Sequence, residues 1–167
     1  MYYAVFLAIF LLSANADDQV EKCRKIFSRE TFQCCSMRHM RPMGVDDGGP
    51  DELKECRDLQ MQPPSCARDE CIATKKGFYV DGKIDFDAFT KLLEKNMAAV
   101  PEILSLIKEK CLKTGVDLSN YGRPEMCDLF KLKDCLLMQS LKNCPEWSDR
   151  DNCKEIKTLV EDCSSIL

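Results

Sequence analysis

Apolar side chains recur at intervals of three and four residues along most of the chain, which is the spacing of one face of an α-helix. The clearest case lies between Asp85 and Asn96, where one face carries Phe86, Phe89, Leu92, Leu93 and Met97. The other face of this stretch is charged, with Asp87, Lys91, Glu94 and Lys95. The pattern predicts an amphipathic helix that follows a turn at residues 79–83.

The same periodicity predicts helices at three further stretches, Pro101–Lys113, Pro124–Lys142 and Asp151–Asp162. Less regular patterns predict helices at Asp18–Gln33, Asp51–Gln60 and Ser65–Lys76. Alternation of period two, which is typical of strands, is confined to a short run at residues 78–80. Pro and Gly mark the loops, the longest of which is residues 41–50. The chain is therefore predicted to be all-α.

The first sixteen residues are predicted to be a secretory signal peptide and not part of the fold. Residues 1–12 form an apolar run that is too short for a membrane-spanning helix, which takes about 20 residues. Ala14 and Ala16 then supply the small side chains that signal peptidase requires. We therefore expect a secreted, extracellular protein without a transmembrane segment, consisting of a single domain over residues 17–167.

Cysteine is the most unusual component of the predicted mature chain. The twelve cysteines are Cys23, Cys34, Cys35, Cys56, Cys66, Cys71, Cys111, Cys127, Cys135, Cys144, Cys153 and Cys163. An even number of cysteines behind a signal peptide predicts six disulfides, formed in an oxidising compartment. The spacings typical of zinc sites are absent, because the chain has no C-x2-C pair and a single histidine, His39. We therefore expect disulfides and no metal ion.

The charged residues are mixed along the chain and do not form blocks. The 24 basic and 28 acidic residues give a formal net charge of −4. No basic run or stripe of alternating aromatic and basic residues suggests binding to nucleic acid or to an anionic membrane. The charges suit the solvent-facing sides of the predicted helices.

No motif of the chain predicts catalysis. Cys34, Cys35 and His39 resemble the adjacent cysteines and the His-Asp pair of secreted phospholipases, but Met40 stands where the Asp is needed. A Ser-His-Asp or Cys-His mechanism would also require His39, and the chain has no G-x-S-x-G motif. Residues 81–87 resemble a calcium loop that lacks most of its ligands, and a turn before an N-capped helix explains them better. The sequence predicts a protein that is not an enzyme and has no cofactor.

The large apolar residues of the helices suit either a dense core or the lining of an internal cavity. Core packing is the default explanation. Six disulfides would destabilise the unfolded chain by about 2–4 kcal/mol each, so a cross-linked helical shell can tolerate a cavity. Eight methionines supply flexible side chains that would suit varied guests. The residues themselves leave both interpretations open.

The cysteine spacing from Cys71 onward is similar to that of a known family. The intervals contain 39 residues from Cys71 to Cys111, eight from Cys135 to Cys144, eight to Cys153 and nine to Cys163. A proline, Pro145, follows Cys144 directly. This pattern resembles the insect odorant-binding protein family, specifically its Plus-C class. Residues 78–97 also resemble the Asp-Gly turn and the following helix of that family.

The resemblance implies a fold and a disulfide pairing. It identifies Cys66, Cys71, Cys111, Cys135 and Cys144 with the second to sixth family cysteines, and leaves the first open among Cys34, Cys35 and Cys56. The family pairs the first with the third, the second with the fifth and the fourth with the sixth. This order implies Cys66–Cys135 and Cys111–Cys144, while Cys127, Cys153 and Cys163 are class-specific additions. The partner of Cys71 stays open, with Cys34 or Cys35 preferred. The implied fold is a helical domain with an extra C-terminal helix, enclosing an apolar cavity.

The function that the resemblance implies is that of a non-catalytic carrier for a small hydrophobic ligand, such as an odorant or another semiochemical. The expected pocket residues are Phe86, Phe89, Leu93, Met97, Leu104, Ile107, Leu132 and Leu136, with Tyr121 as a polar contact. A membrane receptor and a homodimer stay open as further partners. Because His39 is the single histidine, any release of ligand by acid is expected to depend mainly on carboxylates. The alternative is a secreted, disulfide-rich interaction protein, for example a salivary or reproductive-fluid factor, that contacts a protein partner.

Overall fold

The regular structure is almost entirely helical in the residues that the computed structural model describes, which are 19–28, 30–36, 53–59 and 65–167. Residues 19–24 form the first helix. The other elements are the 3-10 helix η1 (Thr31–Gln33), α2 (Lys54–Arg57), α3 (Ala67–Lys75), β1 (Tyr79–Val80), β2 (Lys83–Ile84), α4 (Phe86–Asn96), α5 (Pro101–Cys111), α6 (Asp128–Lys142) and α7 (Asp151–Cys163). The all-α prediction is confirmed. The predicted signal peptide and His39 lie outside the described residues.

The turn and capped helix predicted from residues 79–96 are confirmed. The strands β1 and β2 pair in an antiparallel hairpin whose turn residues, Asp81 and Gly82, have φ angles of 51° and 77°. Asp85 ends the hairpin, and its Oδ1 accepts hydrogen bonds from the backbone N–H groups of Asp87 at 3.0 Å and Ala88 at 2.9 Å. These bonds satisfy two of the N–H groups that a helix leaves unpaired at its start, so α4 begins at the following residue.

The other helices differ from the predictions at one or both ends. The stretch predicted from Pro124 becomes helical only at Asp128, because Cys127 has an extended backbone, with ψ 162°, and is bonded to Cys66. The predicted helix at 18–33 is helical over 19–24 and again, as a single 3-10 turn, over 31–33. Shorter helices than predicted, α2 and α3, form within 51–60 and 65–76.

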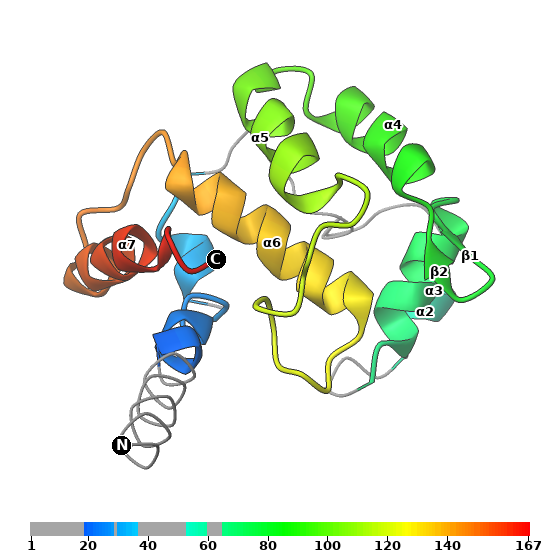
Figure 1. Cartoon of the computed structure of the whole chain (residues 1–167), viewed down its shortest axis with the longest axis horizontal. Coiled ribbons are helices and arrows are strands. Elements are labelled where there is room, and N and C mark those ends of the chain that lie inside the picture. The colour runs from blue at the N-terminus through cyan, green and yellow to red at the C-terminus, as the bar shows by residue number, and fades with distance from the viewer. Residues whose placement is uncertain (1–18, 29, 37–52, 60–64) are drawn as a thin grey trace, which may run out of the picture.

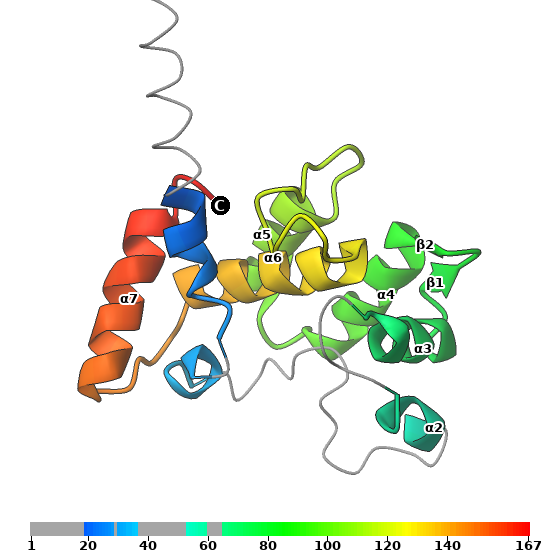
Figure 2. The ribbon, with the colours of Figure 1, turned by 90° about the horizontal axis from the view of Figure 1, so that it is seen from below.

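The long helix α6 runs through the middle of the molecule (Figure 1). Along one side of it lie α5 and, beyond α5, α4. Near its N-terminal end lie α3, the hairpin and α2, whereas α7 and the helix at residues 19–24 lie side by side near its C-terminal end (Figures 1 and 2). Among the described residues, no helix has both the length and the apolar character needed to cross a bilayer.

Three disulfides interlock between residues 53 and 135. They are Cys56–Cys71, Cys66–Cys127 and Cys111–Cys135, with Cα–Cα distances of 5.5, 6.4 and 5.9 Å. Taken in chain order, the six cysteines pair first with third, second with fifth and fourth with sixth. We call residues 53–59 and 65–135, with these bridges, the interlocked unit.

The specific pairings predicted for this region were wrong. Cys66 is bonded to Cys127 and not to Cys135, and Cys111 is bonded to Cys135 and not to Cys144. Cys71 pairs with Cys56, which lies 15 positions before it, and not with Cys34 or Cys35. The helix α6 explains the shift, because it directs Cys135 toward α5 while Cys127, before the helix, lies next to α3.

The other three disulfides join the two ends of the described chain. They are Cys23–Cys163, Cys34–Cys153 and Cys35–Cys144, with sequence separations of 140, 119 and 109. We call residues 19–28, 30–36 and 144–167, with these bridges, the terminal unit. No disulfide connects it to the interlocked unit, since these six bridges use all twelve cysteines. The helix α6 links the two, with Cys135 within it and Cys144 two residues beyond its end.

One hydrophobic core extends through both units. Phe89, Ile107 and Leu132 belong to it in the interlocked unit, and Ile26 and Val160 belong to it in the terminal unit. Packing and the continuous chain of α6, and no disulfide, therefore hold the two units together, and burial of apolar area is the main source of that stability.

Candidate ligand-binding core and groove

The nine residues predicted to bind a ligand converge on the core around α4, α5 and α6. Seven of them are buried core residues: Phe89, Leu93, Met97, Leu104, Ile107, Tyr121 and Leu132. The other two, Phe86 and Leu136, are half-buried and pack against the same core. The tertiary structure thus brings the predicted set together, from three helices and the loop before α6.

Aromatic side chains order this region. The rings of Phe78 and Phe89 have centroids 4.6 Å apart and planes 37° apart, which fixes the hairpin against α4. Phe27, from the terminal unit, lies against Tyr121 with ring centroids 6.4 Å apart. Burial raises the pKa of Tyr121, and a side-chain hydrogen bond with Gln139 of α6 opposes the effect. The phenol that was predicted as a polar contact for the ligand therefore already has a partner within the protein.

The core around these residues is closely packed. Phe89 and Leu132 have no exposed surface and Ile107 is 1% exposed. Neither of the two surface pockets described below is lined by any of the nine predicted residues. A guest that contacted Phe89, Ile107 and Leu132 would therefore need side chains to move aside.

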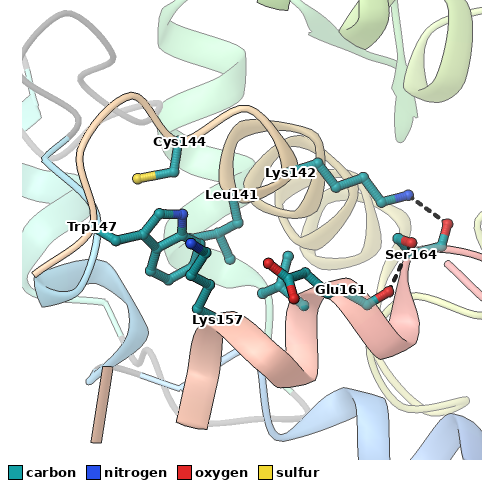
Figure 3. A pocket seen from close by; sticks show the side chains of 8 residues that line it. Leu141, Lys142, Cys144, Trp147, Lys157, Glu161 and Ser164 are labelled. Atoms are coloured by element: carbon teal, nitrogen blue, oxygen red, sulfur yellow. Dashed lines mark hydrogen bonds between the residues drawn. The ribbon is translucent and has the colours of Figure 1, made fainter. Parts of the chain in front are cut away.

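A surface groove of about 520 Å³ lies between α6 and α7 (Figure 3). Its lining residues come from the end of α6, the segment after it and one face of α7: Leu141, Lys142, Cys144, Trp147, Lys157, Val160, Glu161 and Ser164. Leu141 and Val160 are buried at 1% and 3% exposure, so the floor is apolar. Lys157 and Glu161 are exposed, and the ring of Trp147 is half-buried.

Covalent and backbone bonds fix the wall that carries Trp147. Cys144 is bonded to Cys35, and Trp147 pairs with Cys35 in an antiparallel bridge. The N–H of Ser36 donates to the carbonyl of Glu146 at 2.9 Å, and the N–H of Ser148 donates to the carbonyl of Cys34 at 2.8 Å. This wall therefore has little freedom to move.

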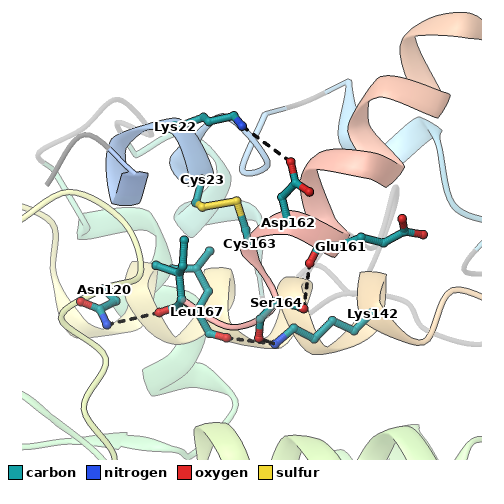
Figure 4. The surroundings of a disulfide bond; sticks show 10 residues. Lys22, Cys23, Asn120, Lys142, Glu161, Asp162, Cys163, Ser164 and Leu167 are labelled. Atoms are coloured by element: carbon teal, nitrogen blue, oxygen red, sulfur yellow. Dashed lines mark hydrogen bonds and ion pairs between the residues drawn. A yellow bond between two sulfur atoms is a disulfide. The ribbon is translucent and has the colours of Figure 1, made fainter. Parts of the chain in front are cut away.

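The opposite end of the groove is closed by Lys142. Its Nζ donates to the main-chain oxygens of Ser164 at 2.8 Å and Leu167 at 2.9 Å, which fixes the segment after α7 (Figures 3 and 4). Burial and the nearby positive charge of Lys110 lower the pKa of Lys142.

A second, smaller pocket of about 250 Å³ lies beside the Cys23–Cys163 bridge (Figure 4). An ion pair at 3.6 Å between Lys22 and Asp162 borders it, and both side chains are more than half exposed. Such an exposed pair contributes little to stability.

One half-buried acid, Asp134, lies where the two units meet. Burial raises the pKa of Asp134 on α6 to about 7, although the charge of Lys133 opposes the shift. The loop residue Gly122 faces it, since a Cβ built there would lie 3.6 Å from Asp134 Oδ2 and 3.3 Å from Met126 Sδ. The φ of Gly122 is +66°, and its carbonyl accepts a 2.6 Å hydrogen bond from Arg24 Nε of the terminal unit. Glycine thus suits this position both for its backbone angle and for the close approach.

Metal binding gains no support from the cysteines. Glu55, Cys56 and Cys71 are close together, but the two sulfurs are bonded to each other and so offer no thiolate. The calcium-loop interpretation of residues 81–87 gives way to the hairpin turn and the Asp85 cap.

Sequence reasoning missed the residues that the terminal unit contributes. Ile26 and Phe27 reach the core because the bridge from Cys23 to Cys163 holds their segment against α7. Trp147 and Lys157 line the groove, and neither lies on an apolar stripe of helical spacing. The only feature of the sequence that marked these segments was a nearby cysteine in each, and the spacing of cysteines does not identify their bonding partners.

Compared with known proteins, the chain matches no family model, no curated protein and no solved structure. Function therefore has to be inferred from the geometry and chemistry of this chain alone.

Proposed function

We propose that this protein is a secreted, non-catalytic carrier for a small apolar molecule. Twelve cysteines, all bonded in pairs, suit an oxidising compartment, and the apolar run at residues 1–12 suits an export signal. The nine predicted ligand residues form one apolar region in a helical shell. A molecule without charge would leave water favourably for such a region.

The disulfide order is the single observation that carries the proposal. The interlocked unit pairs its cysteines in the order that the odorant-binding protein resemblance implies, once Cys56 is taken as the first family cysteine. Cys127 and Cys135 then take the fifth and sixth places, which revises the assignment made from spacing. Under this assignment Cys144 and Pro145 belong to the terminal unit, so the Plus-C comparison rests on the added bridges and not on the proline.

Side-chain movement would make room for a guest. Met97 and Met138 are buried in the core, and their unbranched side chains can adopt other rotamers at small cost. Burying about 300 Å² of ligand surface, at about 25 cal/mol per Å², is worth roughly 7 kcal/mol before the costs of association and rearrangement. We therefore expect affinities no tighter than about micromolar.

Binding of an uncharged naphthyl fluorophore, N-phenyl-1-naphthylamine, tests the proposal. We expect saturable enhancement of its emission by the folded protein, and a change in affinity of at least threefold in Leu132→Ala, which alters the interior. Val80→Ala is the matched control, because Val80 is 54% exposed on the hairpin. Absence of binding to the native protein, together with an organic extract free of apolar molecules, would contradict the carrier function.

The close packing of the interior favours a second candidate, a disulfide-rich interaction protein. Seven of the nine predicted residues are buried core residues, and both described pockets are on the surface. Such a protein would be recovered with a protein partner and without a small molecule. Residues 41–50, which were predicted to be the longest loop and could offer such a partner a contact surface, lie outside the described residues.

A further inference from the structure

The groove between α6 and α7 combines an apolar floor with charged rims (Figure 3). Leu141 and Val160 form the floor and the ring of Trp147 forms a wall. The alkyl stems of Lys142 and Lys157 add apolar surface from two different helices. A long apolar molecule with a polar end would match this arrangement better than a compact uncharged one.

The charges at the groove favour an anionic end. Among its lining residues, two lysines stand against one acid, Glu161. Lys157 forms no ion pair with any residue of the part of the chain that the structure describes. Lys142 already donates to the main-chain oxygens of Ser164 and Leu167, so Lys157 is the cation that is open to a ligand. An anion would supply a partner for Lys157.

We propose that the groove binds a long-chain carboxylate, with its hydrocarbon chain along Leu141, Val160 and Trp147 and its carboxylate beside Lys157. The volume of about 520 Å³ lies within the range of small-molecule sites, which is roughly 300–1,000 Å³. The proposal rests on the carrier function and deepens it, because it gives a ligand class and places a site in the terminal unit, away from the nine core residues.

The disulfides make this site rigid before the ligand binds. The wall with Trp147 is bonded to residues 34–36 through Cys35–Cys144 and two backbone hydrogen bonds. The start of α7 is fixed to the same segment through Cys34–Cys153. A preformed site loses little entropy when it is occupied, which favours affinity.

Trp147 provides the test, because it is the single tryptophan of the chain and lines the groove. The probe is 9,10-dibromostearate, whose bromines quench tryptophan emission on contact. We expect saturable quenching, and affinity at least threefold weaker for its methyl ester, which has the same chain without the charge. Lys157→Gln should weaken binding of the acid about threefold to fivefold, and Glu161→Gln should strengthen it by a similar factor, as for exposed charge pairs. Neither variant should alter binding of the ester.

The opposite signs of the two variants exclude a merely structural effect, since both side chains are exposed and far-ultraviolet circular dichroism should stay unchanged. Absence of saturable quenching, equal affinity for acid and ester, or equal affinity across the variants would overturn the groove site. If the naphthyl probe still binds in that case, with its response to Leu132→Ala intact, the carrier function stands and the groove proposal alone fails. If neither probe binds, both fail.

Discussion

The interlocked unit and the terminal unit contain three disulfides each, yet the bridges constrain the chain in different ways. In the interlocked unit the separations are short, at 15, 61 and 24 residues, and the bridges cross one another in sequence. In the terminal unit the separations are 140, 119 and 109 residues, and the bridges are nested. Sequence separation by itself would assign the larger entropic effect to the terminal bridges.

Because the terminal bridges are nested, we expect them to have the smaller entropic effect, not the larger one. With Cys34–Cys153 intact, Cys23 and Cys163 are already connected by a path of about 20 residues, through residues 23–34 and 153–163. Cys66 and Cys127 have no such short connection. The shortest route between them crosses Cys71–Cys56 and Cys35–Cys144 and still contains about 40 residues. A bridge in a nested set therefore restrains the unfolded chain less than its own separation suggests.

The largest expected effect tests this difference directly. Replacing Cys66 and Cys127 by Ala should lower the free energy of unfolding by about 4 kcal/mol, and replacing Cys23 and Cys163 by Ala should lower it by about 3 kcal/mol. Guanidinium unfolding without reductant measures both. If loss of Cys23–Cys163 were the more costly of the two, the separations of 140 and 61 residues would govern the effect and the nesting argument would be wrong.

Hydrogen bonds connect the two units, between which no disulfide forms. Arg24 donates to Gly122, and Asp134 lies beneath that glycine. Asn120 Nδ2 donates to the carbonyl of Ile166 at 3.5 Å (Figure 4). These contacts, with the packing of Phe27 on Tyr121, determine how tightly the terminal unit is held against the loop before α6.

A smaller effect is expected at Asp134. Its pKa is about 7 in the folded protein and about 4 in the unfolded chain, so the folded state binds more protons between these values. Stability should therefore fall as the pH rises from 4 to 7. Asp134→Asn removes this dependence and should raise the free energy of unfolding at pH 8 by about 1–2 kcal/mol, because an amide is less costly to bury than a carboxylate.

Chemical unfolding at pH 5 and pH 8 measures the effect of Asp134→Asn. The matched control is Asp149→Asn, which removes the same charge from an exposed loop position and should change the pH dependence little. Two results together would contradict the prediction: a wild-type free energy of unfolding at pH 8 that equals or exceeds the value at pH 5, and no increase at pH 8 in Asp134→Asn. They would show that ionisation of Asp134 does not destabilise the folded protein.

The smallest expected effect concerns Arg24. Arg24→Met keeps the alkyl stem but removes the donor to the Gly122 carbonyl, and should lower the free energy of unfolding by about 1 kcal/mol. Lys25→Met is the control, because Lys25 is the exposed neighbour. Amide exchange at Tyr121, whose N–H donates to the Leu118 carbonyl, should accelerate in the Arg24 variant only. Equal exchange in both variants would mean that the hydrogen bond does not restrain the loop.

The helices and the local turn could be predicted from sequence because local interactions determine them. The periodicity of residues 86–96 and the capping carboxylate of Asp85 are properties of consecutive residues, and α4 has the expected bounds. Eight of the nine predicted ligand residues lie on apolar faces of the predicted helices, whereas Tyr121 lies in a loop. Whether these buried residues line a cavity or form a dense core depends on how the helices pack, and periodicity does not specify that packing.

The sequence by itself determined that twelve cysteines would form disulfides in a helical protein. It did not determine their partners, because Cys127, Cys135 and Cys144 are almost evenly spaced and two consecutive members of this series fit the same pattern equally well. Only the tertiary structure placed Cys127 within 6.4 Å of Cys66, measured between Cα atoms, and left Cys144 for Cys35. It alone also assembled the groove, since Trp147 and Lys157 meet only where the terminal bridges hold α7 beside the end of α6. Disulfide bonding requires proximity in space, and for cysteines far apart in the chain the packing of helices provides it.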